Sequence, residues 1–468
     1  MDSIGLSLTP VQASSCLTEL YLKDCNLSCL SEEIGNLISL RTLDLTQNNL
    51  STLPDGICNL TRLKHLDLEA NNVSNLPSGI GSLTSLEELV LSRNSLCTLP
   101  DTIGKLSCLK GLLVEYNNLS TLPDGICNLT RLKHLDLKAN NVSNLPSGIG
   151  SLTSLESLIL TRNSLCTLPD TIGKLSCLKN LFVGNNKLSH LPSEIGDLDS
   201  LRWLELECNN GFRALPESIS KLVYLERLFL GYNISLRSLP KLTLTTTVSA
   251  ESCPSLESPP LELDQLGRHA DYSGSNKLVE NNYLTSLLKQ LPKSKGLSKL
   301  KDVVDIILPA GEEELRIWFP YHDGRGPNVS FVVPPSPSVN QKILGWILRF
   351  VVCAPRGTYL HQPWVSIKGV ICNKIPWHHV ASRIVYPPEV DHVWLMYIPQ
   401  GHRGLQLEGG DEVEIPMYLA SNVPMSIAIE VTHPNTYVKK WAIDLIYEGD
   451  EIHKANDTWW QVAYNIQL

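Results

Sequence analysis

The segment STLPDGICNLTRLKHLDLEANNV, residues 51–73, is one full copy of a unit that recurs along more than half of the chain. The unit reads LxxLxLxxNxLxxLPxxIGxLxx and runs from Leu17 to about Pro259. Each unit has one marker residue. The first eight steps between successive markers are each 23 residues long, the next is 24 and the last is 20, which gives eleven units. The marker is an Asn or a Cys, at Cys25, Asn48, Asn71, Asn94, Asn117, Asn140, Asn163, Asn186, Asn209, Asn233 and Cys253. A constant period of this length predicts a repeat architecture.

The spacing within the unit predicts how each copy folds. In LxxLxLxx the middle leucines alternate with polar residues, which is typical of a short strand with one buried face. One unit cannot bury its leucines alone, so neighbouring units stack into a parallel sheet with a continuous core. The Asn turns inward to satisfy backbone groups of adjacent turns, and LPxxIGxLxx returns along the outer side in a short helical turn. These features identify leucine-rich repeats: an α/β horseshoe solenoid with a parallel sheet on its concave face, expected from about Leu20 to Ala250.

A longer duplication lies inside the array. The segment that begins at Ser51 begins again at Ser120, an offset of 69 residues or three units. Over sixty positions the two copies differ only at four pairs, and all four lie on the strand segment at positions predicted to face solvent. These pairs are Glu69/Lys138, Glu88/Ser157, Val90/Ile159 and Ser92/Thr161. The pattern indicates that the framework stayed constant while the surface changed.

After Pro260 the period ends, and the composition and residue pattern of the sequence change. Residues 265–302 are rich in Lys and Arg, and KLVENNYLTSLLKQL has the leucine spacing of a helix that Pro292 ends. We interpret residues 1–264 as the solenoid and 265–302 as a capping helix with a basic linker. Residues 303–468 contain about eight short alternating runs separated by turn signals, which predict an antiparallel β-sandwich. Its own core is expected to bury most of Trp318, Trp346, Trp394 and Trp441.

Composition and motifs exclude several functions. The chain has 468 residues with 39 Lys plus Arg against 48 Asp plus Glu, a net charge of −9, which disfavours a nucleic-acid-binding role. No apolar run reaches the length of a membrane span, and no secretory signal is visible, so we expect the cytoplasm or the nucleus. No phosphate-binding loop, dinucleotide fingerprint, zincin motif or zinc-spaced Cys pair occurs. We therefore predict no catalytic, cofactor-binding or metal-binding residues.

The concave face is the remaining candidate for function, because the residues beside the strand leucines point to solvent. Its central column contains apolar residues where polar ones are the norm, and aromatic residues flank them. Exposed apolar and aromatic side chains gathered on one face favour a protein-binding surface, unless another part of the polypeptide covers them. The residues expected to bind protein are Leu113, Tyr116, Phe182, Trp203, Phe229 and Tyr232. We expect the ligand where the last regular repeats meet the C-terminal domain, with Trp203 and Phe229 as anchors.

The C-terminal segment resembles the jelly-roll/Ig-like domain (C-JID) that follows the repeats in plant TIR-type nucleotide-binding leucine-rich-repeat disease resistance receptors. KLVENN at Lys277 also resembles that family's segment between repeats and sandwich. The matching stretches are Leu308–Pro309 through Trp318–Phe319 with Pro334–Pro335, Leu344–Gly345, VDHVWLMYIPQ from Val390, GDEVEI from Gly410 and VKKWAIDLIYEGD from Val438. One departure is GEEELRIWF, which lacks the family's Ile-Pro before Trp-Phe, so the first strand is expected to enter differently.

The resemblance implies a role in plant innate immunity, in which the repeats and the jelly-roll domain grip a pathogen effector or a host protein. Nothing in the sequence resembles a TIR or nucleotide-binding domain, so signalling would need such receptor domains in trans. We expect a truncated relative, a partial gene model or a recognition module that works beside other chains; the sequence upstream of Met1 distinguishes these.

Three other interpretations stay open. An intracellular leucine-rich-repeat scaffold of the plant Ras-group type shares LPxxIGxLxxLxxLxLxxN, but it would not need residues 303–468. A hydrolase in the C-terminal half would need a nucleophile and a matching base, and none stands out. A secreted receptor ectodomain is disfavoured by the missing signal and cysteine caps.

Overall fold

The computed structural model describes residues 4–6, 16–243, 245–290, 300–301, 304–318, 328–332, 343–353, 364–367, 370–371, 392–400, 412–420 and 437–447. The chain divides into two compact units, Met1–Leu228 and Phe229–Leu468, each described by itself below. The boundaries expected after residues 264 and 302 stay predictions.

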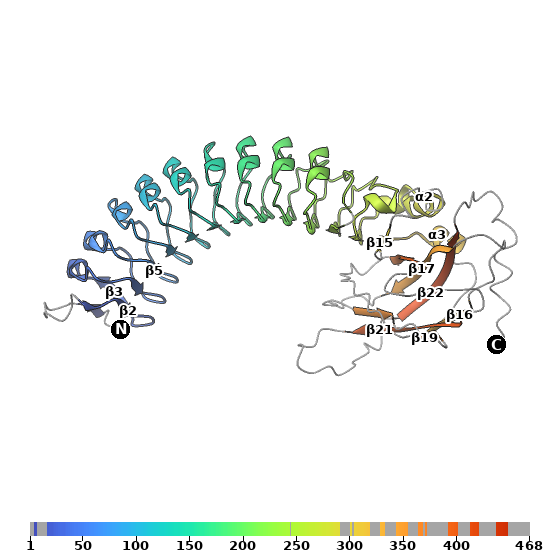
Figure 1. The fold of residues 1–468 in the computed structure, drawn as a ribbon, viewed down its shortest axis with the longest axis horizontal. Helices are drawn as coiled ribbons and strands as arrows, with labels where there is room; N and C mark the ends of the chain where they lie inside the picture. Colours follow the sequence, from blue (N-terminus) through green and yellow to red (C-terminus); the bar gives the residue numbers. More distant parts are fainter. Residues whose placement is uncertain are drawn as a thin grey trace. The chain divides into compact units, whose positions relative to one another are not determined.

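Nine short parallel strands form the sheet of the first unit, and they line the inner side of its arc (Figure 1). Each pairs with the next in register, so that the middle leucines form one row, which is buried from Leu43 onward. The strands are β2 (Glu19–Tyr21), β4 (Thr42–Asp44), β5 (His65–Asp67), β6 (Glu88–Val90), β7 (Gly111–Leu113), β8 (His134–Asp136), β9 (Ser157–Ile159), β10 (Asn180–Phe182) and β11 (Trp203–Glu205). A separate pair, β1 (Ile4–Leu6) and β3 (Leu27–Leu30), is also parallel.

The return segments are short 3-10 helices on the outer side of the arc. Most begin directly after the Pro of LPxx, whose fixed φ, for example −68° at Pro54, prepares the turn. An Ile in each helix is buried against the leucine core, as Ile57 is. The helices are η2 (Glu32–Asn36), η3 (Asp55–Asn59), η4 (Ile80–Ser82), η5 (Asp101–Lys105), η6 (Asp124–Asn128), η7 (Ile149–Ser151), η8 (Asp170–Lys174), η9 (Ser193–Asp197) and η10 (Glu217–Lys221).

The Asn column points inward and links consecutive turns through backbone hydrogen bonds. The Asn140 amide donates to the carbonyl oxygens of Val114 at 2.9 Å and Leu137 at 3.0 Å, and its Oδ1 accepts from the Leu119 N–H at 3.0 Å. The same set recurs at the neighbouring markers, for example at Asn117. The predicted leucine-rich-repeat solenoid, its parallel sheet and its Asn column are confirmed.

The second unit begins inside β12 (Arg227–Phe229) and continues with two more parallel strands, β13 (Thr247–Ser249) and β14 (His269–Asp271). After η11 (Leu263–Gln265) and β14, the predicted capping helix is present as two helices, α1 (Lys277–Glu280) and α2 (Tyr283–Gln290). The single-helix prediction was wrong because Asn282 adopts φ +52°, a left-handed conformation that interrupts the helix.

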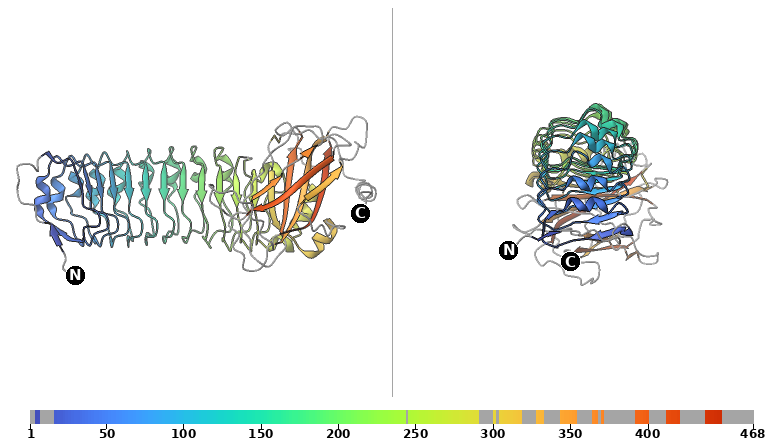
Figure 2. Two further views of the ribbon diagram at one scale, coloured as in Figure 1. Left: turned by 90° about the horizontal axis from the view of Figure 1, so that it is seen from below. Right: turned by 90° about the vertical axis from the view of Figure 1, so that its left-hand side faces the viewer.

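Within this unit the sheet continues past residue 303 (Figure 2, left). β15 (Val304–Pro309) pairs in parallel with β14 and antiparallel with β20 (His392–Pro399). The antiparallel part extends through β17 (Ile343–Cys353) to β22 (Tyr437–Tyr447). The sheet therefore continues across the boundary expected at residue 303. Strand β15 joins its parallel part to its antiparallel part.

A second, smaller sheet consists of β21 (Glu412–Ala420) paired antiparallel with β16 (Asn328–Val332), β18 (Trp364–Ile367) and β19 (Val370–Ile371). GEEELRIWF is mostly helical, as α3 (Glu312–Trp318).

Of the four tryptophans expected in the C-terminal core, Trp394 is fully buried and Trp318 is half-buried. The side chains of Trp346 and Trp441 lie outside the described residues. So do the runs MSIAIEV (425–431) and WQVAYNI (460–466), which were expected to be strands.

Candidate protein-binding surface

The repeat geometry decides which side chains reach the concave face. In each strand from β4 to β11 the middle Leu is buried, while the first and third residues lie on the concave side. The residue before each marker Asn adopts a left-handed conformation that turns the chain out of the sheet. In the first unit these residues include Gln47, Ala70, Arg93, Tyr116, Ala139, Arg162, Asn185 and Cys208.

Phe182 and Trp203 form an aromatic pair on this face. Phe182 ends β10 and Trp203 begins β11, so the two rings meet diagonally, with centroids 6.4 Å apart and planes at 73°. The Arg227 guanidinium carbon lies 4.6 Å from the centroid of the Trp203 ring, within the range of a cation–π contact. Both aromatic side chains are half-buried, so they offer an accessible apolar surface with a cation at its edge.

Tyr116 forms a second aromatic position on the same face. Its side chain is 39% exposed and lies between the Arg93 guanidinium carbon, 5.2 Å from the ring centroid, and the Lys138 ammonium, 6.0 Å from it. Leu113, at the end of β7, is half-buried. Three strand steps separate β7 from β10, about 14 Å at ~4.8 Å per step. The structure thus brings Phe182 and Trp203 together but places Leu113 and Tyr116 in a separate group.

Phe229 and Tyr232, the remaining two predicted residues, belong to the second unit. Phe229 is half-buried, and Tyr232 is 48% exposed with the left-handed backbone of its position. The expectation that the last repeats and the C-terminal domain form one cleft around Trp203 and Phe229 stays a prediction.

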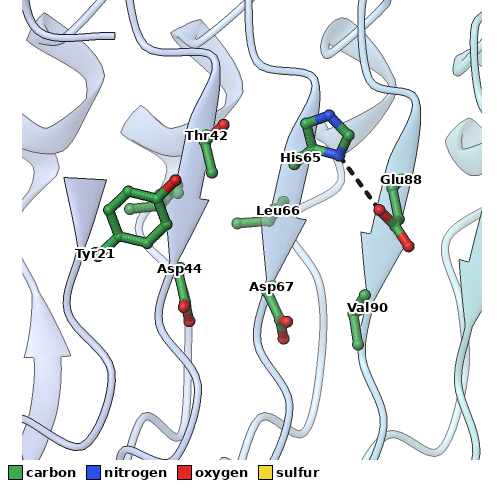
Figure 3. Close-up of a pocket in the computed structure, with 9 residues that line it drawn as sticks. Tyr21, Thr42, Asp44, His65, Leu66, Asp67, Glu88 and Val90 are labelled. Carbon is green, nitrogen blue, oxygen red and sulfur yellow. Dashed lines mark hydrogen bonds and ion pairs between the residues drawn. The ribbon is translucent and has the colours of Figure 1, made fainter. Parts of the chain in front are cut away.

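The structure also shows a hollow that sequence reasoning missed, at the N-terminal end of the concave face (Figure 3). It has a volume of about 250 Å³, and Tyr21 covers one side of it with a side chain that is 61% exposed. His65 Nδ1 lies 3.3 Å from Glu88 Oε2 at the other side. The hollow is lined by Tyr21, Thr42, Leu43, Asp44, His65, Leu66, Asp67, Glu88 and Val90.

The carboxylates of the concave face have perturbed acidities. Burial raises the pKa of Asp67 and of Glu205, and it raises the pKa of Asp136 to about 6. Glu205 reaches across the neighbouring turn to the Thr161 hydroxyl, which donates to it at 3.2 Å. A Cβ at Gly184 would lie 2.4 Å from Glu205 Oε1, so glycine makes room for this contact. The face is thus partly desolvated, which strengthens charge-dependent contacts.

In the part of the chain that the structure describes, no group of three or more His, Cys, Asp or Glu is arranged to hold a metal ion. Within the same ranges, no helix has the length and apolar character that crossing a bilayer requires.

Comparison with protein families agrees with the repeat geometry. A model described as "Leucine-rich repeat region" matches residues 5–95 and 89–181, and one described as "Leucine rich repeat" matches residues 153–210. No curated protein matches the chain.

Several solved structures are similar to part of the chain. A leucine-rich-repeat protein of Leptospira interrogans is 31% identical over 50% of this chain and 67% of its own, with a TM-score of 0.35. The matching chain of a PEPR1–AtPEP1 structure is 29% identical over 56% of this chain and 40% of its own, with a TM-score of 0.43. A third similar structure is the ectodomain of the Arabidopsis thaliana receptor kinase GASSHO1/SCHENGEN3, in complex with CASPARIAN STRIP INTEGRITY FACTOR 2. It is 26% identical over 57% of this chain and 38% of its own, with a TM-score of 0.38.

The chain thus spans about two fifths of the length of each of these two receptor chains. Because all three TM-scores are below 0.5, we base the family assignment on the matching family models and on the repeat geometry. Residues 5–210 therefore form a leucine-rich-repeat region, a kind of array whose concave surface binds proteins.

Proposed function

We propose that this chain is a non-enzymatic protein-recognition module of plant innate immunity, which binds a pathogen effector or a host protein on its concave face. The observation that carries the proposal is the half-buried Phe182–Trp203 pair with Arg227 beside it. Tyr, Trp and Arg supply a large share of binding energy at protein interfaces. The aromatic residues Tyr and Trp bury much area at a low entropic cost. An accessible aromatic pair on a rigid sheet therefore suits an interface anchor.

The immune role is supported by the resemblance of the C-terminal half to the jelly-roll domain of TIR-type receptors. The antiparallel order β20–β17–β22 and the second sheet around β21 are compatible with such a domain. In this proposal the module works with nucleotide-binding receptor domains in trans, in the cytoplasm or the nucleus. Co-immunoprecipitation with TIR-type receptor domains and imaging of a fluorescent fusion in leaf cells test these two points.

The recognition surface is tested by selecting binders for the full chain from a displayed library of pathogen-secreted proteins. Trp203→Ala is expected to weaken the selected binders about thirtyfold or more, corresponding to about 2 kcal/mol for a buried aromatic anchor. Tyr224→Ala is the matched control, because Tyr224 is 63% exposed but lies in the turn after η10, away from the strands. Equal loss in both variants, or no loss in Trp203→Ala, would contradict the proposal.

A further inference from the structure

We infer that the concave face has a direction: it recognises an extended protein segment that is cationic where it lies over β4–β6 and apolar where it lies over β10–β11. This inference rests on the proposed function and adds the charge and the orientation of the partner. It follows from the unequal distribution of side chains along the sheet of the first unit.

The N-terminal end of the face is acidic. Asp44 and Asp67 end two neighbouring strands and line the hollow of about 250 Å³ together with Glu88 of the next strand (Figure 3). His65 contacts Glu88, and Arg93 contacts Glu69 at 3.5 Å, both in exposed pairs. A hollow with carboxylates on its walls and an aromatic ring at its side suits the long side chain of a Lys or Arg.

The other end of the face is apolar and less acidic. Ile159, Phe182 and Trp203 lie there on three consecutive strands, all half-buried. Arg227 beside Trp203 adds positive charge, and Glu205 at the end of β11 adds negative charge. The apolar Phe182–Trp203 pair therefore decides the preference at this end, and an apolar segment fits it.

The internal duplication isolates the acidic character of β5 and β6 from that of the repeat framework. The first copy supplies β5 and β6, and the second copy supplies β8 and β9, on nearly identical frameworks. Two of the four differences, Glu69/Lys138 and Glu88/Ser157, change charge, by two units and by one unit, and both make the first copy more acidic. The chain thus has the same surface twice, with a charge difference of three confined to the concave side.

The length of the face sets the length of the segment. Seven strand steps separate β4 from β11, about 34 Å at ~4.8 Å per step, which about ten extended residues at ~3.3 Å each would span. An extended segment of this length reaches from the acidic hollow to the aromatic pair.

The test uses the full chain to select from a displayed library of random 12-residue peptides. We expect the selected peptides to share Lys or Arg toward one end and apolar residues toward the other. The variant E69K/E88S gives the first copy the charges of the second, and the second copy shows that this framework tolerates them, since Lys138 there stands in the setting of Glu69. S92T is the matched control, because it makes an uncharged replacement of the same duplication at a residue that does not line the hollow.

E69K/E88S is expected to weaken the selected peptides about tenfold in low salt and less in ~0.5 M NaCl, where charges are screened within about 4 Å. S92T should bind like the parent. Selected peptides without charge bias, or equal binding to parent and E69K/E88S, would overturn the direction while leaving protein recognition intact. Failure to select any peptide would overturn the inference, whereas the secreted-protein selection tests the proposed function independently.

Discussion

Replacing Asn140 by Leu tests the inward Asn column, on which the register of the whole array depends. The Asn140 side chain satisfies the carbonyls of Val114 and Leu137 and the N–H of Leu119, and it is only 6% exposed. Leu is similar in size but makes none of these bonds. Each buried backbone group left without a partner costs about 1–3 kcal/mol, so three groups cost about 3 kcal/mol or more.

The assay is urea unfolding of the full chain followed by circular dichroism. The matched control is Asn141→Leu, because Asn141 is the next residue and its side chain is exposed. We expect Asn140→Leu to lower the unfolding midpoint clearly and Asn141→Leu to change stability by less than about 0.5 kcal/mol. Equal midpoints for Asn140→Leu and the parent would refute the assigned register and the bonding role of the column.

Three further predictions concern the same repeats. Ala139 adopts φ +54°, so Ala139→Gly should raise the free energy of unfolding by up to about 1 kcal/mol, and a lower free energy of unfolding would refute the strain. Burial raises the pKa of Asp136 from 3.8 to about 6, so the folded chain holds this proton more tightly than the unfolded chain, and stability falls as the pH rises through this window. Asp136→Asn should therefore give a flatter profile of melting temperature between pH 4 and 7, and a profile parallel to that of the parent would contradict this. Gly104→Ala should destabilise by about 1–3 kcal/mol, because its Cβ would lie 2.1 Å from the Gly125 carbonyl oxygen. Gly111→Ala should be tolerated in the same denaturation assay, because the nearest atom is a Glu88 side-chain carbon at 3.6 Å.

The repeat array could be predicted from sequence because one physical constraint recurs in every unit. Each Leu must be buried against its neighbours and each marker Asn must satisfy backbone groups, so period and residue type together determine the register. The strands from β4 to β11 follow this rule. The positions of Phe182 and Trp203 on the concave face followed from the same period.

The C-terminal half was less predictable because its pairing is not local. β15 was missed as a bridging strand, since nothing in VDIILP indicates parallel pairing on one side and antiparallel pairing on the other. The helix break at Asn282 depends on a left-handed residue that leucine spacing does not reveal.

The acidic hollow was missed for a different reason. Asp44 and Asp67 belong to the exposed column that the sequence reveals, but only its apolar members stand out as unusual. The hollow depends on how side chains from neighbouring strands lie next to one another, with Tyr21 and Glu88 on either side.

The recognition of a partner by the concave face is tested most directly by hydroxyl-radical footprinting of the full chain with and without a selected binder. We predict that the binder protects Phe182, Trp203 and Tyr116 from oxidation and leaves Tyr224, in the turn after η10, as reactive as before. Protection of Tyr224 with unchanged oxidation of Phe182 and Trp203 would contradict the assignment of this face as the binding surface.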